Sequence, residues 1–458
     1  MSQTRTKTDL TQGPLFLRIV LFTLPLVATG ILQLLFNAAD LAVVGSFSGT
    51  MATAAVGCCG SLINLIIQLF MGLSVGAGVI AAQDFGAKRY GEIKCLISTS
   101  IIASVVGGII VGVFGFVMAE PLLALMNTDE EVMVEAVPYM RAYFCGVPAC
   151  LLYNYLAVIL RSYGDTRRPL IFLSVAGVVN VGLNLIAVLG FGLGAVGVGI
   201  ATAASQYVSA FLIIVYMCRT DGPCRIEGLA FDWGKLGRMV LIGLPAGLQS
   251  TLFSFSNTMI QSTINGYGPI VVAGNSAASS LDSFIYISQN AGYHAALTFV
   301  GHHVGAGKHE RIRRIAILCC VEVIAMGLVL GALMMAFGPE LLGIYASDEN
   351  RNAVIAAGMD RLCALGLAYC FCGPMEVGCG VMRGMGKAFI PMVVSLVGSC
   401  LFRVLWIAYV CPLDPTNIQL LYISYPISWI LTSTTHFICC VFTYRALARR
   451  RRSADVAA

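Results

Sequence analysis

Twelve long apolar stretches constrain the fold of this chain more than any other feature. Each is long enough to cross the hydrocarbon core of a bilayer as a helix, which takes about 20 residues. None has the short alternating pattern of a membrane β-strand. The sequence therefore predicts an all-α integral membrane protein with twelve transmembrane helices. The stretches are residues 15–40, 52–78, 94–119, 136–160, 169–190, 194–217, 238–264, 270–299, 313–337, 354–381, 389–411 and 419–444.

Composition and motifs exclude several other classes of protein. Of the 458 residues 58% are hydrophobic and only 11% are charged, whereas a soluble domain carries about 25% charged residues. The 17 cysteines lie mostly in apolar stretches without zinc or redox spacing, so we expect reduced thiols. We expect no signal peptide, because the first 13 residues are polar. No H-E-x-x-H, G-x-S-x-G or phosphate loop appears, so we expect neither an enzyme, an organic cofactor nor a nucleic-acid partner.

The basic residues indicate the orientation in the membrane. With these spans, 24 of the 28 Lys and Arg residues fall on the side of the N-terminus. Arg141, Arg351 and Arg361 fall on the opposite side, and Arg403 lies inside a span. Because Lys and Arg in short loops set orientation, we expect a multi-pass protein of the cell membrane with both termini in the cytoplasm.

The sequence also repeats itself at offsets of 219 to 222 residues, with four landmarks in the same order. Six spans per half predict a parallel repeat, related by a pseudo-two-fold axis along the membrane normal. We expect an N-terminal lobe at residues 1–217, a cytoplasmic linker at 218–237 that lets the lobes move, and a C-terminal lobe at 238–458. The landmarks are Leu21-x-x-Leu24-Pro25 with Leu241-x-x-Leu244-Pro245, Gly86-Ala87 with Gly305-Ala306, Leu122-Leu123 with Leu341-Leu342, and the cytoplasmic turns Arg161-x-x-Gly164 and Arg383-x-x-Gly386.

Asp40 is the carboxylate that stands out in the first stretch. Thr29, Gln33, Asn37 and Asp40 follow one another at helical spacing and share one face. A charged side chain inside a bilayer costs roughly 2.5–3.5 kcal/mol on insertion scales, so it normally faces a cavity or a partner. The polar stripe that leads to Asp40 favours this interpretation over an acid solvated among headgroups.

Other spans of the N-terminal half carry amides and hydroxyls. Asn180 and Asn184 lie one turn apart in the fifth span, and their counterparts in the repeat are near Phe402 and Trp406. Oxygen ligands around one carboxylate suit a proton or Na⁺. The alternative is that these side chains form interhelical hydrogen bonds, worth about 0.6 kcal/mol each. The remaining polar candidates of this half are Asn64, Gln68, Thr202, Ser205, Gln206 and Ser209.

The C-terminal half has buried acids of its own. Glu376 follows Pro374, where a kink frees backbone groups and makes room for a cavity. Asp282 and Glu322 lie in the eighth and ninth spans. We expect Asp282 and Glu376 in a substrate cavity together with Gln33, Asn37, Asn64, Gln68 and Gln206; the alternative is pairing with Arg403, His294 or helix ends.

Five motifs occur along the chain in this order: LP…NAAD…VG, FGAKRYGE, R-x-x-G-x4-P in both halves, VVNVGLN and GVGIAT. Together they resemble the multidrug and toxin extrusion (MATE) transporters, and among them the bacterial branch related to DinF. The resemblance covers residues 15–445 and implies export of cationic or amphipathic small molecules in exchange for Na⁺ or H⁺. It further implies that Asp40 is the ion-linked carboxylate, with Asn180, Asn184, Thr202 and Tyr139 around it. Several members carry Asp where this chain has Asn184, so one carboxylate remains in this lobe.

The mechanism that we expect is alternating access in a monomer, in which Asp40 binds the ion in one state and releases it in the other. A flippase for lipid-linked precursors, of the same superfamily, is the main alternative. It needs basic residues to hold a pyrophosphate, and spans one to six contain no Lys or Arg in mid-membrane. A channel remains open as a further alternative.

Overall fold

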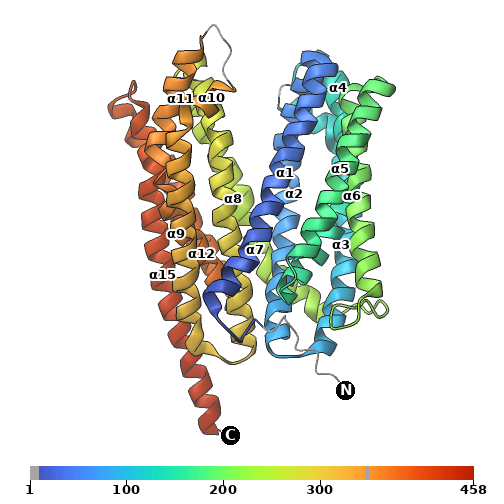
Figure 1. Ribbon diagram of the computed structural model, residues 1–458, viewed down its shortest axis with the longest axis vertical. Helices are drawn as coiled ribbons and strands as arrows, with labels where there is room; N and C mark the ends of the chain where they lie inside the picture. Colours follow the sequence, from blue (N-terminus) through green and yellow to red (C-terminus); the bar gives the residue numbers. More distant parts are fainter. Residues whose placement is uncertain (1–9, 127, 346–349, 458) are drawn as a thin grey trace. The chain divides into compact units, whose positions relative to one another are not determined.

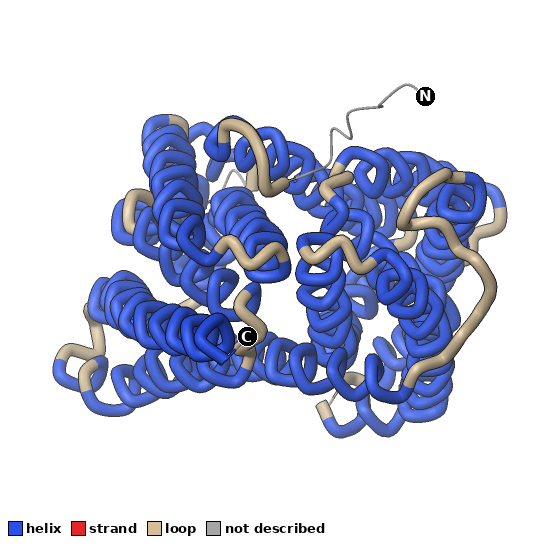
Figure 2. The backbone as a smooth tube through the Cα atoms, turned by 90° about the horizontal axis from the view of Figure 1, so that it is seen from below, coloured by secondary structure: helices blue, strands red, loops and turns tan. Residues whose placement is uncertain are grey.

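The computed structural model describes residues 10–126, 128–345 and 350–457, with side chains as far as residue 449. All regular elements in these residues are helices (Figure 2). Eleven are long and apolar enough to cross a membrane, and a pair bent by 52° at residues 366–368 brings the number to twelve. The predicted all-α membrane fold is therefore confirmed.

The helices follow the predicted spans closely (Figure 1). The fifth and eleventh spans each contain a π-helical segment, at Ile186–Gly190 and Leu396–Leu401. The bent tenth span consists of α11 and α12. The bounds are α1 Leu15–Phe47, α2 Gly49–Gly86, α3 Tyr90–Leu125, α4 Glu130–Tyr163, α5 Arg167–Leu185, α6 Gly194–Arg219, α7 Trp233–Asn265, α8 Pro269–Gly305, α9 Ile312–Ala336, α10 Gly338–Gly343, α11 Arg351–Leu365, α12 Tyr369–Gly384, α13 Phe389–Ser395, α14 Phe402–Tyr409 and α15 Ile418–Ala457; the short turns His309–Arg311 and Cys411–Leu413 are 3₁₀-helical.

The chain forms two compact units, and both divisions between them fall inside helices. The first unit contains residues 28–247, and the second contains residues 10–27 and the chain from Leu248 onward. The divisions follow Val27 in α1 and Gly247 in α7, each two residues beyond the proline of the repeated Leu-x-x-Leu-Pro. The units are thus divided elsewhere than at the 218–237 linker, and the predicted lobe boundaries stay a prediction.

The first unit is built around α4. This helix packs against α2, α3 and α6. Phe144 of α4 is fully buried, and a Cβ atom on Gly115 of α3 would lie only 2.2 Å from its ring. Glycine at position 115 therefore lets a large aromatic side chain fill the space between the two helices.

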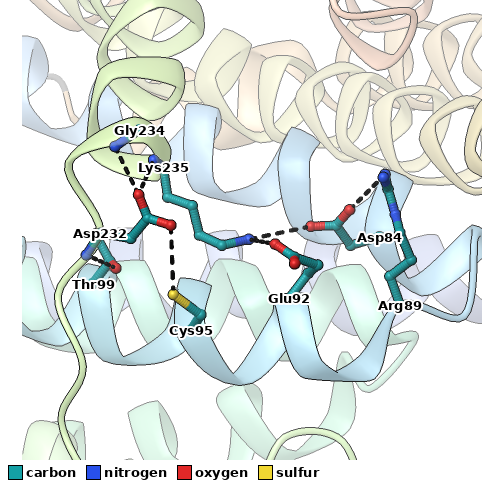
Figure 3. A network of polar contacts seen from close by, with 8 residues as sticks. All are labelled: Asp84, Arg89, Glu92, Cys95, Thr99, Asp232, Gly234 and Lys235. Atoms are coloured by element: carbon teal, nitrogen blue, oxygen red, sulfur yellow. Dashed lines mark hydrogen bonds and ion pairs between the residues drawn. The ribbon is translucent and has the colours of Figure 1, made fainter.

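The linker belongs to the first unit because ion pairs attach it to α2 and α3. The Lys235 ammonium, at the start of α7, lies 2.6 Å from Glu92 and 4.0 Å from Asp84, and Figure 3 shows it between these two carboxylates. Arg89 lies 2.8 Å from the other oxygen of Asp84. The Asp232 carboxylate accepts hydrogen bonds from the backbone N–H groups of Gly234 and Lys235, as an N-terminal cap does.

Glycines bring the first half of α7 into close contact with α2. A Cβ atom on Gly76 would lie 2.1 Å from the carbonyl oxygen of Met239, and one on Gly72 would lie 2.1 Å from the backbone nitrogen of Gly247. Gly72 and Gly76, like Gly243 and Gly247, are four residues apart. Small residues at this spacing let membrane helices approach closely. We conclude that this half of α7 is fixed to the first unit.

The first half of α1 packs into the second unit instead. Ile19 and Phe22 are buried in an apolar cluster with residues of α8, α9 and α12. The ring centroids of Phe22 and Phe299 lie 5.6 Å apart in an edge-to-face contact. This contact explains why residues 10–27 are part of a unit made mainly of the C-terminal half of the chain.

Candidate functional site

A chain of hydrogen bonds joins Asp40 to three other polar side chains of the first unit. The Asn184 Nδ2 group donates to Asp40 Oδ1 over 2.5 Å and to Asn180 Oδ1 over 3.3 Å. Asn180 Nδ2 in turn donates to Thr202 Oγ1 over 3.4 Å. The four residues come from α1, α5 and α6. The structure therefore brings together four of the five residues that the sequence analysis assigned to ion coupling; we call them the Asp40 chain.

Burial differs along the Asp40 chain. Asn184 is fully buried and Asn180 is 5% exposed, whereas Asp40 is half-buried. One end of the chain is thus fixed in the protein interior, and the carboxylate lies where it is partly accessible. A partly accessible carboxylate can exchange a proton or an ion, which a fully enclosed one cannot do without a structural change.

Gly177 makes this arrangement possible, and the sequence analysis missed it. A Cβ atom at this position would lie 1.9 Å from the ring of Phe36 on α1. Only glycine therefore lets α5 approach α1 closely enough for Asn184 to reach Asp40. The available signal was its position one turn before Asn180, on the same face of α5.

The oxygen atoms of the site suit a proton or a hard cation. Asn184 Oδ1 is buried and has no hydrogen-bond partner among the described residues. It and the Asp40 carboxylate are oxygen ligands of the kind that hard cations prefer. Within the described residues, no group of three or more His, Cys, Asp or Glu side chains is arranged to hold a metal ion. The donor set therefore consists of one carboxylate supplemented by amide and hydroxyl oxygens.

Tyr139, the fifth predicted residue, lies beside this chain on α4. It is 6% exposed, and Asp40 is among the titratable side chains near it. Its backbone packs against α6 at Gly199, where a Cβ atom would lie 2.9 Å from the Tyr139 carbonyl oxygen. Among the described residues, no hydrogen bond joins Tyr139 to the Asp40 chain. Tyr139 thus forms part of the surroundings of the site.

The other polar candidates of the first unit are more exposed. Gln33, Asn37 and Asn64 are exposed, and Gln68 and Gln206 are half-buried. In the part of the chain that the structure describes, their side chains make no hydrogen bond to the Asp40 chain. Their assignment to a substrate cavity stays a prediction.

Asp282 of the second unit is paired with an arginine that the sequence analysis did not name as its partner. Arg361, which the charge count assigned to the side of the membrane opposite the N-terminus, is 6% exposed and lies in the interior of its unit. Its Nε donates to Asp282 Oδ2 over 2.8 Å, and its Nη1 donates to Asn275 Oδ1 over 2.8 Å. Pairing was the alternative left open for Asp282, with Arg403 or His294 as the named partners. The partner is Arg361, because α11 faces α8.

Arg383 is also buried, although its position in the repeated turn predicts a cytoplasmic loop. It is 5% exposed and donates to the Tyr293 hydroxyl over 2.7 Å and to Gln249 Oε1 over 2.9 Å. Glu376 lies two turns earlier on α12, is half-buried, and has Arg383 as a charged neighbour. Glu322, the third acid, is 6% exposed and is hydrogen-bonded to Thr23 of α1.

Comparison with known families decides the identity of this fold. A family model described as MatE matches residues 25–186 and 245–409, which together make up most of the chain. The chain belongs to the MatE family. The two matched segments of this MatE chain start at the two prolines, Pro25 and Pro245, of the repeated Leu-x-x-Leu-Pro.

Similar curated proteins cover most of this MatE chain. It is 27% identical to the probable multidrug resistance protein YpnP of Bacillus subtilis over 86% of the chain and 88% of the relative. It is 23% identical to the probable multidrug resistance protein NorM of Thermotoga maritima over 83% of the chain and 82% of the relative. It is 22% identical to the multidrug export protein MepA of Staphylococcus aureus over 86% and 88%, respectively.

Solved structures have the same fold. A MOP superfamily transporter from Pyrococcus furiosus superposes with a TM-score of 0.90 over 98% of this chain and all of that chain, at 21% identity. A multidrug resistance MATE family transporter in an outward-facing conformation gives a TM-score of 0.90 over 97% and 99%, at 19% identity. The predicted family and fold are thus confirmed, while the DinF-like branch stays a prediction.

Proposed function

We propose that this protein is a multidrug efflux antiporter, which exports cationic or amphipathic small molecules in exchange for H⁺ or Na⁺. The observation that carries the proposal is the hydrogen bond from Asn184 to the half-buried Asp40 carboxylate. Support also comes from the names of similar proteins, which are multidrug resistance or export proteins. The family supports a transporter rather than an enzyme, and the substrate class and the coupling ion are part of the proposal.

Charge neutralisation at Asp40 is the proposed coupling step. A bound proton or Na⁺ cancels the carboxylate charge, and the attraction for a cationic substrate falls with it. The ion and the substrate then compete for one negative charge, so the binding of one favours the release of the other. This competition drives transport only if the ion has a different affinity for the two access states. An ion with equal affinity for both does not shift the equilibrium between them.

The donor set accommodates either ion. A proton needs only an Asp40 oxygen, and the Asn184 amide stays beside it as a hydrogen-bond partner. For Na⁺, rotation of the Asn184 amide directs an oxygen instead of its NH₂ group toward the ion. Transport that depends on Asn184 Oδ1 would therefore indicate Na⁺ as the coupling ion, and transport that does not would indicate a proton.

The setting of the protein follows from the sequence analysis. We propose that it functions as a monomer in the cell membrane with both termini in the cytoplasm. The basis is the excess of Lys and Arg on the side of the N-terminus. A cysteine introduced into the 218–237 linker and one introduced into the loop that follows α10 would react with thiol reagents from opposite sides of the membrane of intact cells.

Transport in proteoliposomes tests the proposal. The purified protein is reconstituted, ethidium is the probe, and Na⁺ and H⁺ gradients are imposed in turn. Asp40→Asn removes the charge and keeps the size of the side chain, so we expect gradient-driven ethidium movement to fall to that of empty liposomes. Asp360→Asn is the matched control, because it removes an exposed carboxylate of α11 in the other unit. Equal gradient-driven transport by wild type and Asp40→Asn would refute the proposal.

A flippase for lipid-linked precursors is the second candidate. The observation in its favour is that Arg361, Arg383 and Arg403 lie buried in the second unit, where the sequence analysis expected only Arg403. Arg361 is paired with Asp282, however, and Arg383 with Tyr293 and Gln249. Translocation of a fluorescent lipid-linked precursor in the same liposomes, without ethidium transport, would favour the flippase.

A further inference from the structure

Arg403 is held inside the second unit by aromatic and hydroxyl groups. It is the second residue of α14, directly after the π-helical segment Leu396–Leu401, and it is 4% exposed. Its Nε donates to Ser428 Oγ over 2.9 Å. Its Cζ lies 4.2 Å from the ring centroid of Tyr425 and 5.8 Å from that of Trp429. All three partners come from α15, and none carries a negative charge.

The other buried arginines of this unit have different partners. Arg361 is paired with the Asp282 carboxylate, and Arg383 has Glu376 as a charged neighbour. Among the described residues, no ion pair includes Arg403. The groups that act on it electrostatically are the neutral side chains of Tyr369, Tyr425, Cys372 and Cys400. A guanidinium stays protonated in proteins, so this unit contains a buried positive charge without a carboxylate partner.

One side of the Arg403 guanidinium is also free of hydrogen bonds. Its Nη2 atom is buried and has no hydrogen-bond partner in the described part of the chain. Buried polar groups in proteins almost always have a partner, and an exception calls for an explanation such as a bound ion. A guanidinium N–H group is only a donor, so its partner has to be an acceptor. An anion supplies both the acceptor and the missing charge.

The position of Arg403 in the repeat supports this interpretation. The turns at Arg161 and Arg383 are related by an offset of 222 residues, which places the counterpart of Asn180 at Phe402, next to Arg403. In the first unit this part of the repeat contributes amide oxygens next to a carboxylate. In the second unit it contributes a guanidinium. The corresponding parts of the repeat thus differ in charge, with neutral amides in the first unit and a guanidinium in the second.

We propose that Arg403 binds a small monovalent anion inside the second unit. The ligand is either a free halide or the carboxylate group of an organic anion, since both accept a hydrogen bond from Nη2 and neutralise the guanidinium. Tyr425 and Trp429 form the wall beside it. This site lies outside the Asp40 chain and does not depend on the proposed antiport, because binding requires no gradient.

Trp429 provides a direct reporter of anion binding. The chain has three tryptophans, at positions 233, 406 and 429. With Trp233→Phe and Trp406→Phe, the fluorescence of the full-length protein in detergent comes from Trp429, which is 4% exposed. We expect iodide to quench it with a saturable dependence on concentration, with sulfate as the balancing anion. Displacement by chloride identifies a halide site, and displacement by benzoate identifies a carboxylate site; either supports the proposal.

Variants of the same protein separate binding from non-specific quenching. Arg403→Met should remove the saturable component or raise its half-saturation at least tenfold. Arg403→Lys keeps the charge and should raise the half-saturating iodide concentration only several-fold. This variant also covers the case in which Arg403→Met does not fold. Arg314→Met, which removes an exposed charge of the same unit, should leave it unchanged. Quenching that is absent, or linear and equal in folded wild type and Arg403→Met, would overturn the proposal.

Discussion

The Asp282–Arg361 pair gives a prediction whose size follows from its geometry. The two side chains are 3% and 7% exposed and meet at 2.8 Å, and Arg361 also donates to Asn275. Removal of one partner leaves the other charged and buried. Such a loss costs about 3–5 kcal/mol of the free energy of unfolding, whereas replacement of both charges by well-packed apolar groups is often neutral. We therefore expect Arg361→Met to reduce the ratio of folded to unfolded protein by at least about a hundredfold.

A double-mutant cycle separates the pair from its surroundings. Asp282→Leu, Arg361→Met and the double variant are unfolded reversibly in mixed micelles, and the free energies of unfolding are compared. We expect each single variant to lose about 3 kcal/mol or more and the double variant to lose about 1–2 kcal/mol, so that the coupling energy is large. Asp360→Asn, at an exposed carboxylate of the same helix as Arg361, should be within about 0.5 kcal/mol of wild type.

The reasoning fails on a specific result. Each single variant could have a free energy of unfolding within about 1 kcal/mol of that of wild type, and the two effects could simply add in the double variant. This result would mean that the two charges are hydrated and not paired in the folded protein. The pair would then not stabilise the packing of α8 against α11. Asp282 would instead be available for the substrate cavity in which the sequence analysis placed it.

Three further predictions test other parts of the molecule. Gly76→Leu forces a Cβ atom to within 2.1 Å of the Met239 carbonyl oxygen, so we expect thermal stability to fall by the equivalent of about 1–3 kcal/mol; Gly57→Leu, with open space around it, is the control. The pKa of Asp232 is lowered by hydrogen bonds from backbone N–H groups at the start of α7. Its contribution to stability is present above the ordinary pKa of an aspartate and is lost as the pH falls through the lowered value. Wild type should therefore have a higher melting temperature than Asp232→Asn at neutral pH, and the two melting temperatures should converge at strongly acidic pH. Thr202→Val should raise the ion concentration for half-maximal ethidium transport less than tenfold, because its hydrogen bond from Asn180 is long, at 3.4 Å; complete inactivation would contradict this.

The sequence predicted the fold well because the bilayer leaves few alternatives. Long apolar stretches have to be helices, since every backbone polar group needs a partner inside the hydrocarbon. The Asp40 chain was predictable for a related reason. A carboxylate and two amides are costly in that environment, and helical periodicity placed them on single faces.

Other features depend on tertiary contacts that no local pattern contains. The pairing of Arg361 with Asp282 could not be predicted, because the two residues are 79 positions apart and hydropathy does not show which helix faces α11. Gly177 and Gly76 looked like ordinary glycines of apolar stretches, and only the neighbouring helix shows why a side chain is excluded there. That the polar linker lets the lobes move stays a prediction. No local pattern showed that its charges pair with residues of α2 and α3.

The placement of α1 links these findings. Its first half packs against Phe299 in the second unit, and its second half carries Asp40 to Asn184 in the first. In the proposed antiport, an ion that binds at Asp40 therefore acts on a helix that belongs to both units. The first half of α7 packs against Gly76 and is attached to the first unit through Lys235. The chain passes from one unit to the other just after Pro25 and just after Pro245. Proline removes the helical hydrogen bond to the residue four positions earlier, so the turn directly before each of these segments takes less energy to bend than the rest of the helix.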